Sequence, residues 1–338
     1  MTTKVQDLER PSLQRETWPS RIFAGTEPFI ELALEAFRYQ AHFNPVYAAY
    51  LQALAIDVES IHSIEKIPFL PIRFFKTTIV KTGKFEPIAI FESSTTTGTI
   101  PSLHAVKDLS LYRQSFTQCF EQFFGSYKDW CLLALLPSYL ERKNSSLVLM
   151  MEELIQQSGH PLSGFYLKEH DRLQQTLQQL EAQQQPTLLL GATFGLLDFA
   201  EAHPLPLQHT TIIETGGMKG RRRELTRLEV HQQLQSAFQL TQVGAEYGMT
   251  ELLSQAWSKK DGIFSCPSWM KVLVREEEDP LTVLSQGMGA LNIIDLANID
   301  SCCFIGTDDA GRVSANGQFE IVGRLDGSDI RGCSLLTA

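Results

Sequence analysis

The chain has 338 residues, of which 43% are hydrophobic and 20% charged. This length suggests about two domains with a sizeable core, and the composition excludes intrinsic disorder. The 29 basic and 39 acidic side chains give a net charge of −10, which argues against nucleic acid as a partner. The start of the chain lacks a secretory signal and no window has the roughly 18 apolar residues of a membrane span, so we expect a cytoplasmic protein.

The N-terminal part combines helical patterns with turns that contain proline. The stretch EPFIELALEAFRYQAHF at 27–43 has helical periodicity, and IEKIPFLPIRFF at 64–75 reads as turns. We therefore predict a helical layer over residues 1–85 and an α/β domain over 86–338, packed together as one globular unit.

Strand-like and helical segments then alternate along the chain. The expected strands are PIAIF (87–91), WCLLALLP (130–137), TLLLGATF (187–194) and TTIIETGG (210–217). The expected helices are 111–125, which stops at Gly125, then 170–185, and 226–238, which opens with Thr226 and Glu229 in capping-box spacing. This order predicts an α/β fold with largely parallel sheets flanked by helices.

The end of the chain carries a different signal. GRVSANGQFEIVGR at 311–324 consists of two alternating runs joined by Asn316 and Gly317, which is typical of a hairpin with a type I′ turn. We expect a small antiparallel hairpin region at the C-terminal end of the fold.

Three polar loops follow predicted strands. They are SSTTTGTIPS (93–102), AEYGMTE (245–251), and GTDDAGR (306–312) followed by GRLDGSDIRGC (323–333). Binding loops of α/β proteins gather at the carboxyl ends of strands, so the three segments are expected to converge. Each segment also has a purely structural reading: a surface turn for the hydroxyl-rich loop and for the paired aspartates, and a helix start for Thr250 and Glu251.

Taken together, the three segments resemble the adenylate-forming ligases, the superfamily of acyl-CoA synthetases and luciferase-like enzymes. Within it, ETGGMKGRRRELTR (214–227) and GRLDGSDIRGCSLL (323–336) look most like the acyl-protein synthetase of the bacterial luminescence fatty-acid reductase complex. The resemblance covers roughly residues 90 to 335. It implies the large N-terminal domain of the superfamily.

The resemblance also implies roles for individual residues in binding ATP and Mg²⁺. Glu251 would hold Mg²⁺, Thr250 would contact the α-phosphate, and Tyr247 would stack on adenine. The remaining nucleotide-binding positions that it implies are Ser94, Thr96, Thr97 and Gly98 for the phosphates, Gly216 and Gly217 near adenine, Asp309 for the ribose hydroxyls, and Arg324. Thr95 and Ser102 depart from the superfamily pattern, which has glycine and often lysine there. His104, just after this loop, reads as a loop residue or a base, and we favour the loop residue.

The six cysteines are Cys119, Cys131, Cys266, Cys302, Cys303 and Cys333. They form no CxxC pair or zinc-like cluster, so we expect reduced thiols, most of them buried. The resemblance implies that Cys333 is an acyl acceptor, since a thiolate attacks acyl-adenylates; the alternative is a cysteine packed in a final strand. The chain ends five residues later, where superfamily members continue into a mobile C-terminal domain, so we expect that domain to be missing.

The resemblance thus implies an enzyme that activates a carboxylic acid, in this case a fatty acid, as acyl-AMP. The acyl group would then pass to a protein cysteine or to a fatty-acid reductase subunit as partner. Two alternatives remain open: an acyl-CoA ligase that uses free CoA, and a non-catalytic nucleotide- or acyl-binding subunit of a reductase complex.

Overall fold

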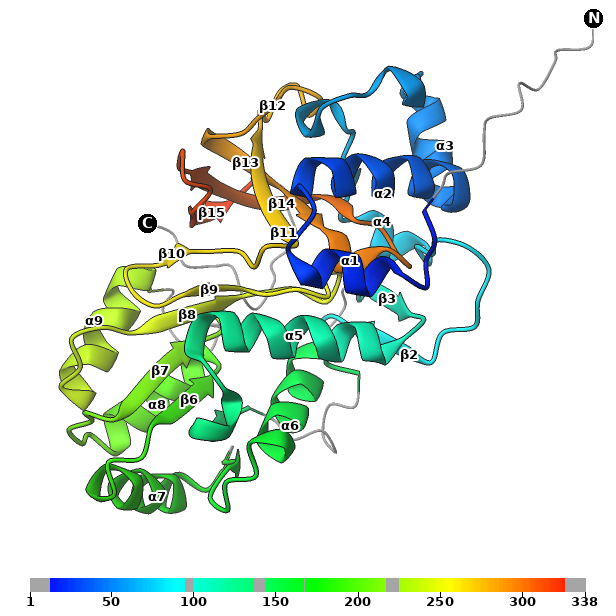
Figure 1. Cartoon of the computed structure of the whole chain (residues 1–338). Coiled ribbons are helices and arrows are strands. Elements are labelled where there is room, and N and C mark those ends of the chain that lie inside the picture. Colours follow the sequence, from blue (N-terminus) through cyan, green and yellow to red (C-terminus); the bar gives the residue numbers. More distant parts are fainter. Residues whose placement is uncertain (1–12, 95–99, 137–143, 167, 217–224, 326–338) are drawn as a thin grey trace, which may run out of the picture.

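The computed structural model describes residues 13–94, 100–136, 144–166, 168–216 and 225–325 (Figure 1). Two β-sheets lie side by side, with helices on both faces of the first and N-terminal helices against the second. A separate two-stranded hairpin, β2 (Ala89–Glu92) and β3 (Leu103–Val106), stands between these parts. Among the helices that the structure describes, none has both the length and the apolar character needed to cross a membrane.

The first sheet confirms the predicted alternation of strands and helices. Its strand order is β5-β4-β6-β7-β8-β9, and all neighbours are parallel except β8 and β9. The strands are β4 (Cys131–Leu135), β5 (Gly164–Phe165), β6 (Thr187–Gly191), β7 (Thr210–Glu214), β8 (Gly244–Tyr247) and β9 (Ala256–Ser258). The helices are α5 (Leu109–Phe124), α6 (Ser146–Ser158), α7 (His170–Ala182), α8 (Thr193–Ala202) and α9 (Arg227–Phe238).

Both faces of this sheet are covered, which explains why its strands are continuous apolar runs. Leu132 and Ala134 of β4 join the core cluster that contains α5 and α6, whereas Leu133 and Leu135 join the cluster of α7, α8 and α9. Successive strand residues point to opposite faces, so a strand buried on both sides has no polar position.

The expected helix boundaries are confirmed at two places. At α9, the Thr226 hydroxyl accepts a hydrogen bond from the Glu229 backbone N–H at 3.2 Å, and the Glu229 carboxylate accepts one from the Thr226 N–H at 2.7 Å. At the end of α5, Gly125 has a φ of +78°, a conformation that glycine adopts without a steric penalty. Local sequence therefore sets both ends without help from tertiary contacts.

The second sheet is larger than predicted. In place of a small hairpin, residues 263–324 supply six strands in the order β10-β15-β14-β13-β11-β12, with antiparallel neighbours throughout, and β1 adds to β14 in parallel. The strands are β1 (Leu70–Pro71), β10 (Ile263–Phe264), β11 (Met270–Arg275), β12 (Val283–Leu284), β13 (Gly287–Asp295), β14 (Phe304–Val313) and β15 (Phe319–Arg324). Residues 290–295 of β13 are all buried, so this strand lacks the polar alternation that signals an antiparallel strand.

The hairpin of β14 and β15 exists, but its turn is not type I′. Val313 pairs with Phe319, so five residues connect the strands. Gly317 has a φ of +80° and donates its N–H to the Ser314 carbonyl at 2.9 Å, whereas Asn316 has no positive φ. A type I′ turn needs positive φ at both central residues, so the asparagine-glycine pair predicted the hairpin correctly and its turn type wrongly.

The N-terminal helices pack against the second sheet. They are α1 (Trp18–Ala24), α2 (Phe29–Phe43), α3 (Pro45–Ala53) and α4 (Phe74–Thr77), with the short 3₁₀ turns η1 (Val58–Ser60) and η2 (Ile64–Lys66); two more 3₁₀ turns are η3 (Tyr127–Asp129) and η4 (Leu296–Asn298). Trp18 is fully buried and donates its indole N–H to the Leu296 carbonyl at 2.8 Å, and Gln40 of α2 donates to the Asn298 carbonyl at 3.0 Å. The helix predicted in this region is α2; the division of the chain at residue 85 stays a prediction.

Candidate functional site

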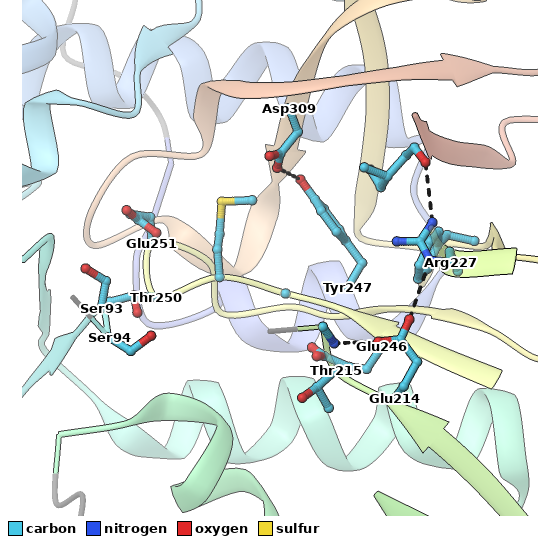
Figure 2. A pocket seen from close by; sticks show the side chains of 15 residues that line it. Ser93, Ser94, Glu214, Thr215, Arg227, Glu246, Tyr247, Thr250, Glu251 and Asp309 are labelled. Carbon is cyan, nitrogen blue, oxygen red and sulfur yellow. Dashed lines mark hydrogen bonds and ion pairs between the residues drawn. The ribbon is translucent and has the colours of Figure 1, made fainter. Parts of the chain in front are cut away.

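A pocket opens where the carboxyl ends of β7 and β8 face the second sheet and the β2–β3 hairpin (Figure 2). Crevices at this edge of parallel sheets are where α/β proteins bind ligands. The residues that line it are Ser93, Ser94, Glu214, Thr215, Gly216, Arg227, Glu246, Tyr247, Gly248, Met249, Thr250, Glu251, Phe264, Asp309 and Ile321.

The structure brings together residues from all three polar segments of the sequence, although residues 306–312 lie within strand β14 and not in the loop that we expected. Six of the predicted site residues line the pocket: Ser94, Gly216, Tyr247, Thr250, Glu251 and Asp309. Five others, Thr96, Thr97, Gly98, Gly217 and Cys333, lie outside the described residues. Arg324 does not line the pocket and instead contacts one of the residues that do. Convergence of the loops is thus observed, while the individual roles stay predictions.

Tyr247 and Asp309 connect the two sheets across the pocket. The Tyr247 hydroxyl donates a hydrogen bond to Asp309 Oδ2 at 2.8 Å, as Figure 2 shows. Arg324 pairs with Asp309 across β14 and β15 and places its Nε 3.4 Å from Asp309 Oδ1. The Asp309 backbone N–H donates to the Thr307 hydroxyl at 3.1 Å. A carboxylate fixed in this way can accept hydrogen bonds from vicinal hydroxyls.

Buried side chains hold the backbone of the segment that carries Thr250 and Glu251. His104 Nδ1 lies 2.8 Å from the Thr250 carbonyl, and Asn298 donates its amide N–H to the Glu251 carbonyl at 2.8 Å. Because a carbonyl only accepts, His104 Nδ1 is the protonated nitrogen. Burial lowers the pKa of His104, so the ring is neutral. His104 lies on β3 rather than in the loop that we expected.

The base of the hydroxyl-rich loop is closed by paired hydrogen bonds. The Ser102 N–H donates to Ser93 Oγ at 2.9 Å, and the Ser93 N–H donates to the Ser102 carbonyl at 3.1 Å. This places Ser93 and Ser94 at the pocket, next to the Thr250–Glu251 segment. Ser102, the position where the superfamily often has lysine, is fully buried.

A buried carboxylate forms the floor of the pocket at the end of β7. Glu214 accepts hydrogen bonds from the Thr193 hydroxyl at 2.8 Å and from the Gly216 N–H at 2.6 Å. Arg227 Nε lies 3.5 Å from Glu214 Oε1, and His231 Nε2 lies 3.9 Å from the same atom. Burial acts to raise the pKa of Glu214, but the interactions with His231 and Arg227 outweigh it and lower the pKa to about 2. Glu214 is therefore ionised and holds the backbone N–H of Gly216.

We expect the Glu214→Gln variant to be less stable than the wild type by on the order of 3 kcal/mol at pH 7. The pKa of Glu214 in the folded protein lies below its ordinary value of 4.5, so the stabilisation is present above about pH 4.5 and is lost as the pH falls toward 2. Urea denaturation of the wild type and the variant at pH 7 and pH 3 measures their free energies of unfolding. The difference between these free energies should be less than half as large at pH 3 as at pH 7. A difference that does not change with pH would contradict it.

For several lining residues the sequence predicted no individual role. They are Glu214, Thr215, Arg227, Glu246, Gly248, Met249, Phe264 and Ile321. Glu214 could have been found, because it ends a predicted strand at the edge where ligands bind. Phe264 belongs to β10, a strand of the second sheet that the sequence did not predict, whereas Ile321 lies on β15 of the predicted hairpin.

The donor set suits a magnesium nucleotide. Mg²⁺ is usually held by one or two carboxylates together with substrate phosphates, and Glu251 supplies one carboxylate next to the hydroxyls of Ser94 and Thr250. Within the described ranges no group of three or more histidine, cysteine, aspartate or glutamate side chains could bind a metal by itself. The pocket thus fits an ion that arrives with phosphates.

The fold is similar to that of solved adenylate-forming enzymes. The ATP-bound MatB from Rhodopseudomonas palustris matches with a TM-score of 0.52 at 14% identity, over 81% of this chain and 52% of that chain. The amide bond synthetase McbA from Marinactinospora thermotolerans matches with a TM-score of 0.50 at 15% identity, over 92% of this chain and 66% of that chain. A malonyl-CoA ligase in complex with methylmalonyl-CoA and AMP matches with a TM-score of 0.50 at 15% identity, over 72% and 54%.

These similarities define the fold as that of the N-terminal part of adenylate-forming enzymes, and the chain spans about half the length of MatB, at 52%. A model of the LuxE acyl-protein synthetase family matches residues 26–338, and the chain belongs to this family. No curated protein matches the sequence significantly.

Proposed function

We propose that this protein is an ATP-dependent acyl-adenylating enzyme, an acyl-protein synthetase that activates a carboxylic acid and passes the acyl group to a protein thiol. The observation that carries the proposal is the convergence of Ser94, the Thr250–Glu251 segment and the Tyr247–Asp309 pair on one pocket. Three segments separated by many residues share no structural reason to present these particular groups to one cavity. Membership of the acyl-protein synthetase family supports the same reaction class.

In the first step, a carboxylate oxygen of the acid attacks the α-phosphorus of ATP, and the bond from that phosphorus to the bridging oxygen breaks to release pyrophosphate. Bound Mg²⁺, held by Glu251, would offset the negative charge of the phosphates. The Thr250 and Ser94 hydroxyls would donate hydrogen bonds to phosphate oxygens, while Asp309 would accept them from the ribose. Arg324 would keep Asp309 oriented through their contact at 3.4 Å.

In the second step, a thiolate attacks the acyl carbonyl carbon, the new C–S bond forms, and AMP leaves with the electrons of the C–O bond. Cys333 is our candidate acceptor. The five cysteines of the described ranges are free thiols, and four of them are buried. Burial raises the pKa of Cys131 to about 11 and that of Cys266 and of Cys302 to about 12, which keeps these thiols protonated and unreactive. A fatty acid as substrate and a reductase subunit as the final acceptor are the further parts of this proposal.

The test is acid-dependent exchange of labelled pyrophosphate into ATP, measured on the purified protein with Mg²⁺ and a panel of carboxylic acids. The proposal expects exchange with at least one acid, together with a mass increase of the protein that hydroxylamine removes. Binding of ATP without exchange for any acid would refute the enzyme and favour a nucleotide-binding subunit. Pyrophosphate exchange without an adduct on the protein, but with formation of acyl-CoA when free CoA is added, would favour an acyl-CoA ligase.

We expect Asp309→Asn to raise the KM for ATP about 10- to 100-fold, because a hydrogen bond to a charged group contributes about 1.5–3 kcal/mol. The KM for the acid should change far less, since Asp309 faces the predicted ribose position. Pyrophosphate exchange at varied concentrations of ATP and of the acid gives the two KM values separately. Equal increases in both constants would instead indicate a general disturbance of the pocket.

A further inference from the structure

The segment that carries Glu251 is held by a short stretch at the end of a strand of the second sheet. This stretch consists of Asp295, the last residue of β13, and the 3₁₀ turn η4 that follows it directly. Asp295 and Asn298, the last residue of η4, are both fully buried. Asn298 lies 47 residues after Glu251 in the sequence, so only the fold brings the two together.

Asp295 binds the part of the segment that follows Glu251. Its Oδ2 accepts a hydrogen bond from the Leu253 backbone N–H at 2.9 Å, and its Oδ1 accepts one from the Ser254 hydroxyl at 2.6 Å. Burial raises the pKa of Asp295 to about 6, so the side chain is a carboxylate at pH 7 and both of its oxygens accept. The residues two and three positions after Glu251 are thereby fixed.

The same carboxylate also sets the position of Asn298. Asp295 Oδ1 accepts a further hydrogen bond from the Ala297 backbone N–H at 3.1 Å, which caps the start of η4. Asn298 ends this turn, and its side-chain amide donates to the Glu251 carbonyl at 2.8 Å. Asp295 therefore acts on the backbone around Glu251 by two routes, one direct and one through Asn298.

The Asn298 side chain is not the best choice for stability alone. Within the described residues its only hydrogen bond is the one to the Glu251 carbonyl, and its Oδ1 is buried without a donor. A buried acceptor without a donor costs stability. Leucine has a similar size and would avoid that cost, but it could not donate to the Glu251 carbonyl. The amide is thus explained by its contact with this segment.

His104 completes the hold on the other side of Glu251, because its Nδ1 donates to the Thr250 carbonyl at 2.8 Å. Buried side chains therefore bind two successive carbonyls, those of Thr250 and Glu251, and Asp295 binds the backbone that follows. A rigid backbone matters for Mg²⁺, which requires near-ideal octahedral geometry. Supporting hydrogen bonds of this kind orient the ligands of metal sites.

We propose that Asp295 and Asn298 are positioning residues for adenylation, which fix the backbone around Glu251 so that its carboxylate is held where Mg²⁺ binds. The inference rests on the proposed function, in which Glu251 binds the ion. Neither Asp295 nor Asn298 lines the pocket, so both act through the Glu251 segment and not by contact with ATP, the acid or the metal.

Asn298→Leu is the main variant, because it removes the hydrogen bond to the Glu251 carbonyl together with the unsatisfied oxygen. We expect its melting temperature to stay within about 4 °C of the wild type. The kcat of acid-dependent pyrophosphate exchange should fall about 10- to 100-fold, and the Mg²⁺ concentration for half-maximal exchange should rise, since a small misplacement of a catalytic group has effects of this size. The KM for the acid should change less than about twofold.

Asp295→Asn is the second variant, and Asp300→Asn is its matched control. Asp300 is also a buried aspartate, but its Oδ1 accepts a hydrogen bond from Arg15 Nε at 2.8 Å, and it does not contact residues 250–254. Both variants should lower the melting temperature, and only Asp295→Asn should lower kcat and raise the requirement for Mg²⁺. Combined with Asn298→Leu, it should lose less than the product of the single losses, because both substitutions act on one segment.

Two results would overturn the inference and leave the proposed function intact. One is a wild-type kcat and Mg²⁺ requirement in Asn298→Leu, and the other is an equal loss of kcat in Asp295→Asn and Asp300→Asn. If Asn298→Leu does not fold, Asn298→Asp replaces it, because the carboxylate keeps the shape of the side chain and lacks the donor.

Absence of exchange in the wild type with every acid would instead refute the proposed function. Calorimetric titration with ATP, with and without Mg²⁺, then tests the positioning role separately. The gain in ATP affinity that Mg²⁺ produces in the wild type should be lost in Asn298→Leu. An equal gain in both proteins, or no gain in the wild type, would contradict the inference.

Discussion

Glu251→Gln is expected to reduce acid-dependent pyrophosphate exchange by at least about 10²–10³-fold. The substitution keeps the size of a side chain that is fully buried, and it removes the negative charge that would hold Mg²⁺. The Glu251 carbonyl still accepts the hydrogen bond from Asn298 at 2.8 Å, so the backbone of the segment keeps one of its contacts. The loss should therefore arise from chemistry rather than from unfolding.

Exchange kinetics at varied Mg²⁺, together with thermal unfolding, measure the effect. Glu320→Gln serves as the control, since it removes a partly exposed carboxylate that is 3.6 Å from Arg312 and does not line the pocket. If Glu251→Gln exchanged at the wild-type rate with an unchanged requirement for Mg²⁺, Glu251 would not be the metal-binding carboxylate. A strongly lowered melting temperature would assign the loss to folding.

Cys333→Ser is expected to abolish the hydroxylamine-labile acyl adduct while leaving pyrophosphate exchange within about twofold of wild type. Exchange reports only the adenylation step, which precedes attack by a thiol, so the two signals should separate. Serine is close in size to cysteine, but its hydroxyl stays protonated at neutral pH and is a weak nucleophile without a base.

Intact mass before and after hydroxylamine gives the adduct, and peptide mapping gives its position. Cys266→Ser is the matched control, because Cys266 is the one described cysteine that is partly exposed at the residue level. An adduct that survives in Cys333→Ser and disappears in Cys266→Ser would assign the acceptor to Cys266. If the wild-type protein carried no adduct and added CoA became acylated instead, the result would favour an acyl-CoA ligase.

The parallel sheet could be predicted because its strands are read from local sequence alone. Cys131–Leu135 and Thr187–Gly191 are apolar without interruption, since helices cover both faces. The helices α5 and α9 of the same domain also have ends that local sequence marks, at Gly125 and at the Thr226–Glu229 capping box. The second sheet could not be predicted in the same way. Two of its strands, β1 and β10, pair with strands far along the chain, and the fully buried stretch of β13 hides the alternation that marks antiparallel pairing.

The candidate site also has features that the sequence determined and features that depend on the tertiary structure. The sequence by itself determined which segments supply polar groups, because hydroxyls and carboxylates in Ser93–Ser94, Thr250–Glu251 and Asp309 have no apolar role at strand ends. Only the tertiary structure decided that Glu214 is ionised and that His104 contacts Thr250. These properties depend on distances between residues that are remote in the chain, and burial sets their energies, which no local pattern encodes.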